Sequence, residues 1–334
     1  MPISNRLRLA ALGVLIPCAV FAQGAPVGTP VGTPVGTPTV DVMNGLWGKH
    51  AGVRANHAKG LVTEGTFTPS KDAPGLSKAA IFAGAPVPVT VRFSNSTGLP
   101  DLADGNPNAN PHGMGIQFRP PGAPEVHVVV NSLKFFPVAN GEEFLELLTA
   151  AAGSPPDAPK PTKIEQFMAA HPAAPKAFGS TQTPSSFAHE TYNGIDAFIF
   201  VNNEGVRQPF RFRFDPVAGP EHLTPDQAAK MPPGFLAAEL NTRLAREPAK
   251  FRVMAQLAAP GDSTRDPTQP WPDDRRLVDL GELVIAKPAD DQVKAASNLR
   301  LLPSQLEPGI EVSDDPLISA RVQAYVISFG RRAQ

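Results

Sequence analysis

Short runs of alternating hydrophobic and polar residues recur along most of the chain and predict a structure built mainly from β-strands. Many positions in these runs are β-branched or aromatic, which is typical of half-buried strands. The clearest case is a hairpin over 195–216, in which two alternating runs flank the turn sequence Asn-Asn-Glu-Gly at 202–205. Further strands are expected at 60–70, 86–98, 112–120, 125–136, 249–258 and 275–287.

Helical patterns are fewer, and they lie between the strands and at the end of the chain. The segment 140–151 predicts a helix that Asn140 opens, with Glu142 and Glu143 in its first turn. Other helical segments are expected at 224–246, in part of 290–304 and at 314–332. Antiparallel strands with inserted and appended helices indicate an α+β fold around a β-barrel or a highly curved sheet, in one domain.

The last of these helices has its own start signals. Ser313 is expected to be the N-cap, and the Asp-Asp-Pro sequence at 314–316 suits the first helical turn. Arg321 and Tyr325 follow four residues apart, so they lie on one face of this helix.

The first residues, MPISNRLRLAALGVLIPCAVFAQG, predict a secretory signal peptide over residues 1–22. Arg6 and Arg8 precede an apolar run that ends in small residues, and this run is too short to span a bilayer. Export to the periplasm is therefore expected, with lipidation at Cys18 as an alternative. Cys18 is the only cysteine, so the mature chain has no thiol, which excludes cysteine nucleophiles and cysteine-ligated iron.

Residues 23–40 contain the unit V-G-T-P three times and predict an extended tether. The alternative interpretation is that the repeat has no function. The folded domain is then expected over 41–334.

Composition and charge narrow the function classes. The chain has 334 residues, a formal net charge of −1 and 42% hydrophobic residues, enough apolar content for a sizeable core. A near-neutral balance indicates neither nucleic acid nor an anionic membrane surface as a partner. The seven histidines form no H-E-x-x-H pattern, which argues against a metal hydrolase.

Tyr325 is one of only two tyrosines in the chain, and it has two interpretations. In the first, its ring packs and its hydroxyl faces solvent. In the second, it is a tyrosinate ligand of ferric haem iron, with Arg321 supplying positive charge that stabilises the phenolate.

A histidine and two arginines near the start of the domain also have two interpretations. His57 is either a structural residue or the base that a peroxidatic haem needs to move a proton between peroxide oxygens. Arg54 and Arg92 are either solvated or suited to haem propionates. Ser94 could hydrogen-bond the histidine ring and orient it.

Five segments occur in the order found in haem catalases: NHAKGLVTEGTF, VRFSNSTG, HGMGIQF, ETYNGIDAFIFVNNEG and PGIEVSDDPLISARVQAY. Over residues 45–332 the chain resembles the catalase-related peroxidases, the short exported relatives of the catalases. The resemblance implies a catalase-like antiparallel β-barrel with inserted and C-terminal helices, without the C-terminal helical domain of full-length catalases. It also implies haem b as the cofactor.

The resemblance assigns roles to individual residues. Tyr325 matches the iron ligand on the proximal side of the haem, and Arg321 matches the arginine that bonds its phenolate. His57 matches the catalytic histidine on the opposite, distal side, and Ser94 its hydroxyl partner.

Other matches concern the haem itself. Arg54 and Arg92 match arginines that face the propionates, and Phe144 matches a phenylalanine on the distal haem face. Arg332 matches a further basic haem contact, with Arg331 as an alternative one residue away.

The chain departs from catalases in two places. Asn131 is the candidate for their distal asparagine, with the register uncertain by one residue. The chain also ends soon after the proximal helix, which implies a monomer or small homo-oligomer and an open approach to the haem.

The expected activity is therefore reduction of organic peroxides, hydrogen peroxide or both, with electrons from an unidentified external donor. The alternatives are an isomerase or lyase of fatty-acid hydroperoxides and a non-enzymatic exported haem-binding protein.

Overall fold

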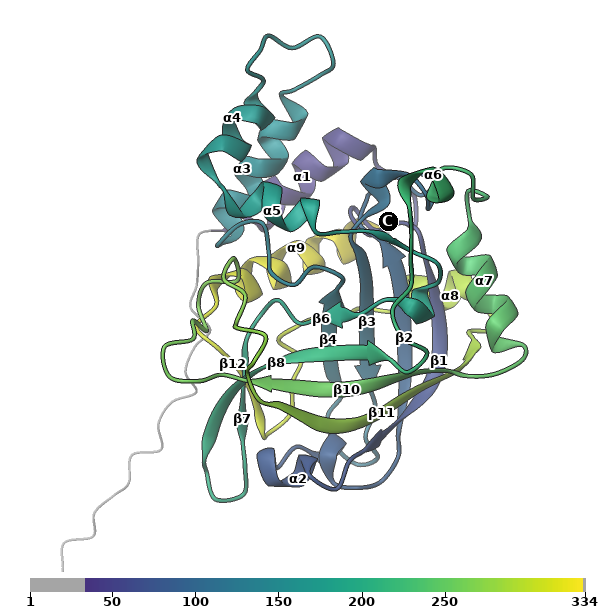
Figure 1. Cartoon of the computed structure of the whole chain (residues 1–334), viewed down its shortest axis with the longest axis vertical. Helices are drawn as coiled ribbons and strands as arrows, with labels where there is room; N and C mark the ends of the chain where they lie inside the picture. The colour runs from purple at the N-terminus through teal and green to yellow at the C-terminus, as the bar shows by residue number, and fades with distance from the viewer. Residues whose placement is uncertain (1–33, 333–334) are drawn as a thin grey trace, which may run out of the picture.

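An antiparallel β-barrel forms the centre of the molecule in the computed structural model, which describes residues 34–332 (Figure 1). Eight strands run around it in the order β10-β11-β1-β2-β3-β4-β6-β8, and pairing of β8 with β10 closes the ring. Beyond β8, β7 and β12 extend the sheet, and β5 pairs with β9 separately. The strands are β1 (Gly60–Pro69), β2 (Val87–Asn95), β3 (His112–Phe118), β4 (Val126–Asn131), β5 (Thr183–Pro184), β6 (Tyr192–Asn193), β7 (Phe198–Val201), β8 (Arg207–Pro216), β9 (His222–Leu223), β10 (Ala249–Leu257), β11 (Leu277–Pro288) and β12 (Ile310–Val312).

Alternation along the strands places a large aromatic core inside this barrel. Phe210, Phe212 and Phe214 on β8 are buried together with Phe93 on β2 and Phe251 on β10. Side chains of alternate residues point to the same face of a strand, so one run of alternating phenylalanines contributes several rings to one core.

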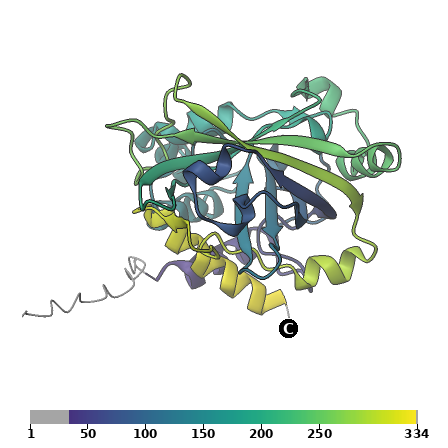
Figure 2. The same ribbon diagram turned by 90° about the horizontal axis from the view of Figure 1, so that it is seen from below.

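Helices lie outside the barrel, and several of them gather on one side (Figures 1 and 2). Helix α1 packs against both α9 and α3, and α9 also contacts α3. The helices are α1 (Gly36–Trp47), α2 (Ala73–Leu76), α3 (Gly141–Ala152), α4 (Lys163–Ala170), α5 (Ala173–Gly179), α6 (Pro225–Ala228), α7 (Phe235–Leu244), α8 (Gln292–Asn298) and α9 (Pro316–Arg332). None of the helices within 34–332 is long and apolar enough to cross a membrane.

The expected α+β barrel is confirmed, as are the strands and the hairpin of β7 and β8. The cap of α3 is also as predicted, because the Asn140 side chain accepts a hydrogen bond of 2.8 Å from the Glu143 N–H. The single helical segment at 224–246 is instead two helices, α6 and α7. Two adjacent prolines, Pro232 and Pro233, lie between them and cannot donate the backbone hydrogen bonds of a continuous helix.

The start of α9 differs from the expected one. The Asp315 carboxylate accepts a hydrogen bond of 2.8 Å from the Leu317 N–H, directly before the helix begins at Pro316. Ser313 accepts from the Asp315 N–H instead and donates to the Thr264 carbonyl. The prediction of Ser313 as N-cap is therefore wrong by two residues, because a side chain that caps a helix must reach the N–H groups of its own first turn.

Helix α1 corrects the expected tether and the boundary at Asp41. It begins at Gly36, inside the V-G-T-P repeat, and buries Gly36, Thr39, Val40 and Met43. Burial against α3 and α9 offsets the weak helix propensity of this segment, which is why local composition misled the prediction. The expected signal peptide over 1–22 and the tether over 23–33 lie outside the described residues.

Candidate active site

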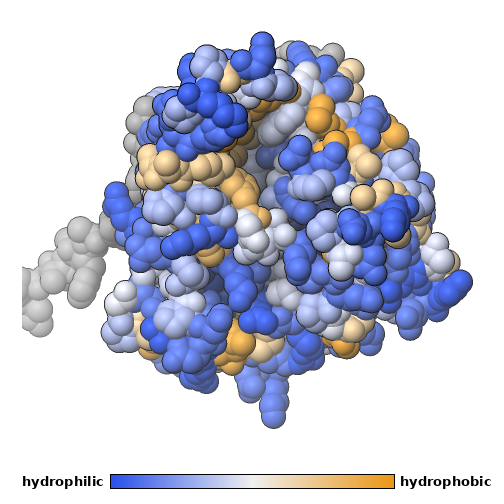
Figure 3. All heavy atoms as spheres, turned by 45° about the horizontal axis from the view of Figure 1, so that its top comes forward, coloured by the Kyte–Doolittle hydropathy of each residue, from blue (hydrophilic) through white to orange (hydrophobic). Residues whose placement is uncertain are grey.

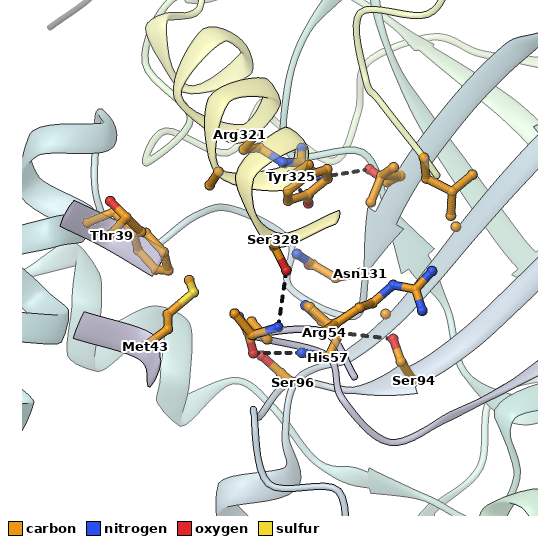
Figure 4. A pocket seen from close by; sticks show the side chains of 18 of the residues that line it. Thr39, Met43, Arg54, His57, Ser94, Ser96, Asn131, Arg321, Tyr325 and Ser328 are labelled. Carbon is orange, nitrogen blue, oxygen red and sulfur yellow. Dashed lines mark hydrogen bonds between the residues drawn. The ribbon is translucent and has the colours of Figure 1, made fainter. Parts of the chain in front are cut away.

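A cavity of about 230 Å³ opens between the barrel and helices α1, α3 and α9 (Figure 4). A single buried water needs roughly 10–15 Å³, so the cavity has room for a much larger ligand. Every candidate site residue from the sequence lines it: Arg54, His57, Arg92, Ser94, Asn131, Phe144, Arg321, Tyr325 and Arg332. Nothing in 34–332 groups three or more His, Cys, Asp or Glu side chains in a way that could hold a metal ion.

His57 occupies one wall of this cavity in an unusual backbone conformation. Its φ of 55° is the only positive φ of a non-glycine residue within 34–332. Such a conformation costs about 1–3 kcal/mol and persists only where its surroundings enforce it. Arg92 donates a hydrogen bond of 2.9 Å to the His57 carbonyl, and the Asn56 side chain accepts one of 2.8 Å from its N–H. The surroundings therefore hold the strained backbone in place.

The imidazole of His57 is oriented and uncharged. Its Nδ1 lies 3.1 Å from the Ser94 hydroxyl, which is the contact expected from the sequence. Burial lowers the pKa of His57 to about 3, and the charges of Arg92, Arg321 and Arg54 act in the same direction. With Nδ1 facing Ser94, the neutral ring can offer its Nε2 lone pair as a proton acceptor.

Two buried histidines predict a loss of stability in acid. Burial lowers the pKa of His57 to about 3 and that of His112 to about 4, whereas an unfolded histidine titrates near 6.5. Below pH 6.5 the unfolded chain therefore binds protons that the folded chain does not, and each histidine should remove about 2 kcal/mol of stability between pH 7 and pH 5. Urea unfolding of wild type and His112→Leu at both pH values checks this, because the variant lacks one of the two losses. Equal pH dependence in the two proteins would contradict the prediction.

Helix α9 carries the phenol and the guanidinium on another wall of the cavity (Figure 4). Arg321 donates to the Tyr325 hydroxyl oxygen from Nε at 3.3 Å and from Nη2 at 3.1 Å. The same guanidinium forms an ion pair with Asp196. Burial opposes the charge of Arg321, but Asp196 and Tyr325 outweigh it and raise the pKa of the arginine. Two charge-assisted donors on one phenol oxygen stabilise negative charge there.

Asp196 and Asp315 belong to this arrangement and were missed by the sequence reasoning. The Asp196 side chain is 2% exposed. Burial raises the pKa of both carboxyls, that of Asp315 to about 8, and Arg321 opposes the rise. A signal for Asp196 was available, because a carboxylate inside the apolar run GIDAFIFV is expected to be paired when it is buried.

Three arginines give the cavity a positive side. Burial lowers the pKa of Arg54 to about 7 and the pKa values of Arg92 and Arg332 to about 10, with further lowering of Arg54 by the other two. Their side chains donate to backbone carbonyls, and none has an ion-pair partner among residues 34–332. The Nε atoms of Arg92 and Arg332 are buried without any hydrogen-bond partner there. Such a cluster is suited to an anionic ligand.

The remaining predicted residues lie around the same cavity. Asn131 ends β4, and its side-chain oxygen accepts a hydrogen bond of 2.9 Å from the Leu133 N–H. Phe144 projects from α3, with its ring centre 5.5 Å from that of Phe136. Arg331 forms an ion pair with Asp41 at 2.6 Å and does not line the cavity. Arg332 does line it.

Helix α1 contributes a wall that the sequence did not indicate. Thr39, Val40 and Met43 line the cavity, and the first and last of these are labelled in Figure 4. Thr39 and Val40 follow the repeat directly, in the segment where the sequence predicted an extended tether, and Met43 lies three residues further on.

A closed antiparallel barrel with this set of flanking helices is the fold of catalases. A fungal catalase superposes with a TM-score of 0.75 at 19% identity, over 85% of this chain and 60% of that chain. The present chain thus spans about 60% of the length of this solved catalase.

Sequence comparison places the chain in that family. The catalase family model matches residues 49–332. A catalase-related peroxidase of Synechococcus elongatus is 32% identical over 93% of this chain and 92% of its own length. One of Mycolicibacterium paratuberculosis is 32% identical over 86% and 92%. The chain belongs to the catalase family.

Proposed function

We propose that this protein is a haem-dependent peroxidase that reduces organic peroxides, hydrogen peroxide or both. One observation carries the proposal: a buried, neutral histidine lines the same cavity as a phenol that receives two N–H groups from an arginine. Membership of the catalase family and likeness to catalase-related peroxidases support an enzyme that acts on peroxide.

The residues around the cavity fit haem b. Its two propionates would meet Arg54, Arg92 and Arg332, which are otherwise without anionic partners in 34–332, and Phe144 would lie against one face of the ring. Tyr325 would be the protein ligand of the iron, in the catalase mode. Bound there, haem supplies an iron centre that peroxide can oxidise and that an external donor can reduce again.

His57 would move the proton that lets the peroxide O–O bond break. Its Nε2 would take the proton from one peroxide oxygen and return it to the other, which would leave as water or as an alcohol. The first oxygen would also become water once the external donor has supplied two electrons and two protons have been taken up. Ser94 holds the ring in orientation through Nδ1. Asn131 lines the same space and could hydrogen-bond the peroxide.

Arg321 and Asp196 would keep the iron ligand anionic. The two N–H groups of Arg321 stabilise the phenolate of Tyr325, and the ion pair with Asp196 fixes the guanidinium in the required orientation. Electron donation from the phenolate then favours cleavage of the O–O bond.

The wall formed by α1 supports organic peroxides among the substrates. Val35, Val40 and Met43 give this wall an apolar surface. The surface of the molecule is hollowed beside hydrophobic side chains in Figure 3, consistent with access for molecules larger than hydrogen peroxide.

We also propose that the protein works after export, in the periplasm. The support is the charged, apolar and small-residue order of residues 1–22. The electron donor would then be a molecule of that compartment.

The test is turnover of the haem-loaded mature chain, residues 23–334, with hydrogen peroxide and with cumene hydroperoxide. We expect consumption of a chromogenic electron donor that depends on peroxide. Conversion of a fatty-acid hydroperoxide without use of the donor would support the isomerase or lyase instead. Haem binding without any turnover would support the non-enzymatic haem-binding protein instead.

A further inference from the structure

We propose that Asp104 is a positioning residue for His57 and that it acts through Lys59. The inference rests on the proposed function, in which His57 transfers the proton. It concerns an ion pair outside the cavity, since neither Lys59 nor Asp104 lines it.

The position of His57 has to be set closely, because the space around its ring is narrow. A Cβ atom on Gly113 would lie 3.0 Å from the His57 Cε1 atom and 3.1 Å from Nδ1. Strand β3 therefore approaches the imidazole so closely that a side chain on Gly113 would push the ring by a few tenths of an ångström. A ring displaced away from Ser94 would lose their 3.1 Å contact.

The backbone that carries this ring is in the strained conformation described above, with φ of 55°. Such a residue relaxes unless its neighbours on both sides are held. On the C-terminal side, Ala58 donates to the Thr97 carbonyl at 2.8 Å and the Lys59 carbonyl accepts from Asn95 at 3.1 Å. These bonds hold the main chain, and the side chain of Lys59 adds a further attachment.

Lys59 extends from this segment to a buried carboxylate. Its Nζ lies 2.6 Å from the Asp104 Oδ1 atom and donates to the Leu102 carbonyl at 3.0 Å and to that of Pro233. The Asp104 side chain is 2% exposed.

Asp104 is in turn bound to two other elements. It accepts 2.9 Å hydrogen bonds from the Asn95 side chain, at the end of β2, and from the Leu236 N–H, in the first turn of α7. The carboxylate thereby joins the segment after His57 to the barrel and to a helix outside it.

A role in stability alone does not account for this pair. A buried ion pair contributes little net stability compared with apolar residues of similar volume, because desolvation offsets the attraction. Lys59 follows the strained His57 by two residues, so the pair is explained by the need to hold the backbone of His57 in position. A displacement of about 1 Å at a catalytic group can cost about 10²-fold in rate.

Lys59→Met in the haem-loaded protein tests the inference, with hydrogen cyanide as the probe. When hydrogen cyanide binds, its proton passes to a base in the cavity and the cyanide anion binds the ferric iron, so the association rate reports on His57. We expect association about 10–100-fold slower than in wild type. The absorption spectrum of the ferric protein should stay that of wild type, because Tyr325 and Arg321 are unchanged.

The control is Arg275→Met, which breaks an ion pair of similar burial far in sequence from His57 and Lys59. Arg275 and Lys59 have side chains 25% and 23% exposed, and their partners Asp262 and Asp104 are 7% and 2% exposed. Arg275→Met should lose stability to a similar degree in urea and bind cyanide at the wild-type rate. Lys59→Arg, which keeps the charge, should recover part of the rate.

Three results would each overturn the role of Asp104 and Lys59 and leave the proposed function standing. They are a wild-type cyanide rate in Lys59→Met, equal slowing in Arg275→Met, and loss of haem from Lys59→Met. If Lys59→Met does not fold, Asp104→Asn takes its place, with the same slowing expected, and failure of both to fold would assign the pair to folding instead. A wild-type protein that takes up no haem would overturn the proposed function and, with it, this inference.

Discussion

Replacement of His57 by alanine should lower the rate of peroxide reduction by about 10²–10⁴-fold, the usual contribution of a positioned acid–base group. The physical reason is the neutral state of this ring, whose pKa burial lowers to about 3. A neutral ring has a lone pair that can take the peroxide proton, and its low pKa means that the protonated ring returns the proton readily to the departing oxygen. Without the imidazole, the cavity loses the group that carries this proton.

The measurement is steady-state turnover of haem-loaded His57→Ala with hydrogen peroxide and with cumene hydroperoxide. His171→Ala is the control, because His171 stacks on Phe167 next to the end of α4 and does not line the cavity. Haem content and spectrum should be retained in both variants. Turnover of His57→Ala within about threefold of wild type, far inside the range for acid–base catalysis, would exclude His57 as the proton carrier.

Replacement of Tyr325 by phenylalanine should abolish the charge-transfer features of tyrosinate-ligated ferric haem. Loss of partners outside the ligand shell already costs about 10–100-fold at metal sites, so loss of the ligand itself should lower turnover by at least about 100-fold. Arg321 then keeps its ion pair with Asp196 but loses the oxygen that accepts from Nε and Nη2. An absorption spectrum of the loaded protein and a turnover assay measure the two effects.

Tyr192→Phe is the matched control, because Tyr192 is the other tyrosine of the chain. It is fully buried in the barrel, and its hydroxyl donates to the Phe187 carbonyl at 3.0 Å. The variant should lose about 1 kcal/mol of stability, as expected for one hydrogen bond, with an unchanged haem spectrum. A Tyr325→Phe spectrum identical to that of wild type would mean that another group binds the iron.

The sequence by itself determined the barrel strands, the shared face of the β8 phenylalanines and the relation of Arg321 to Tyr325. Each of these depends on residues close together in the chain. Alternation places the phenylalanines of β8 on one face, and a spacing of four residues places Arg321 beside Tyr325 on a helix. Resemblance to catalases assigned roles to His57, Ser94 and the arginines, and the structure gathers all of them around one cavity.

Only the tertiary structure decided which distant groups complete the site. Asp196 reaches Arg321 and Asp104 reaches Lys59 across 125 and 45 positions of the chain, and no local pattern encodes such a pairing. Helix α1 likewise forms because α3 and α9 bury one of its faces, although its own residues are weak helix formers. Local patterns determine the direction in which a side chain points from its own element. Closure of the barrel and packing of the helices determine which distant residues that side chain contacts.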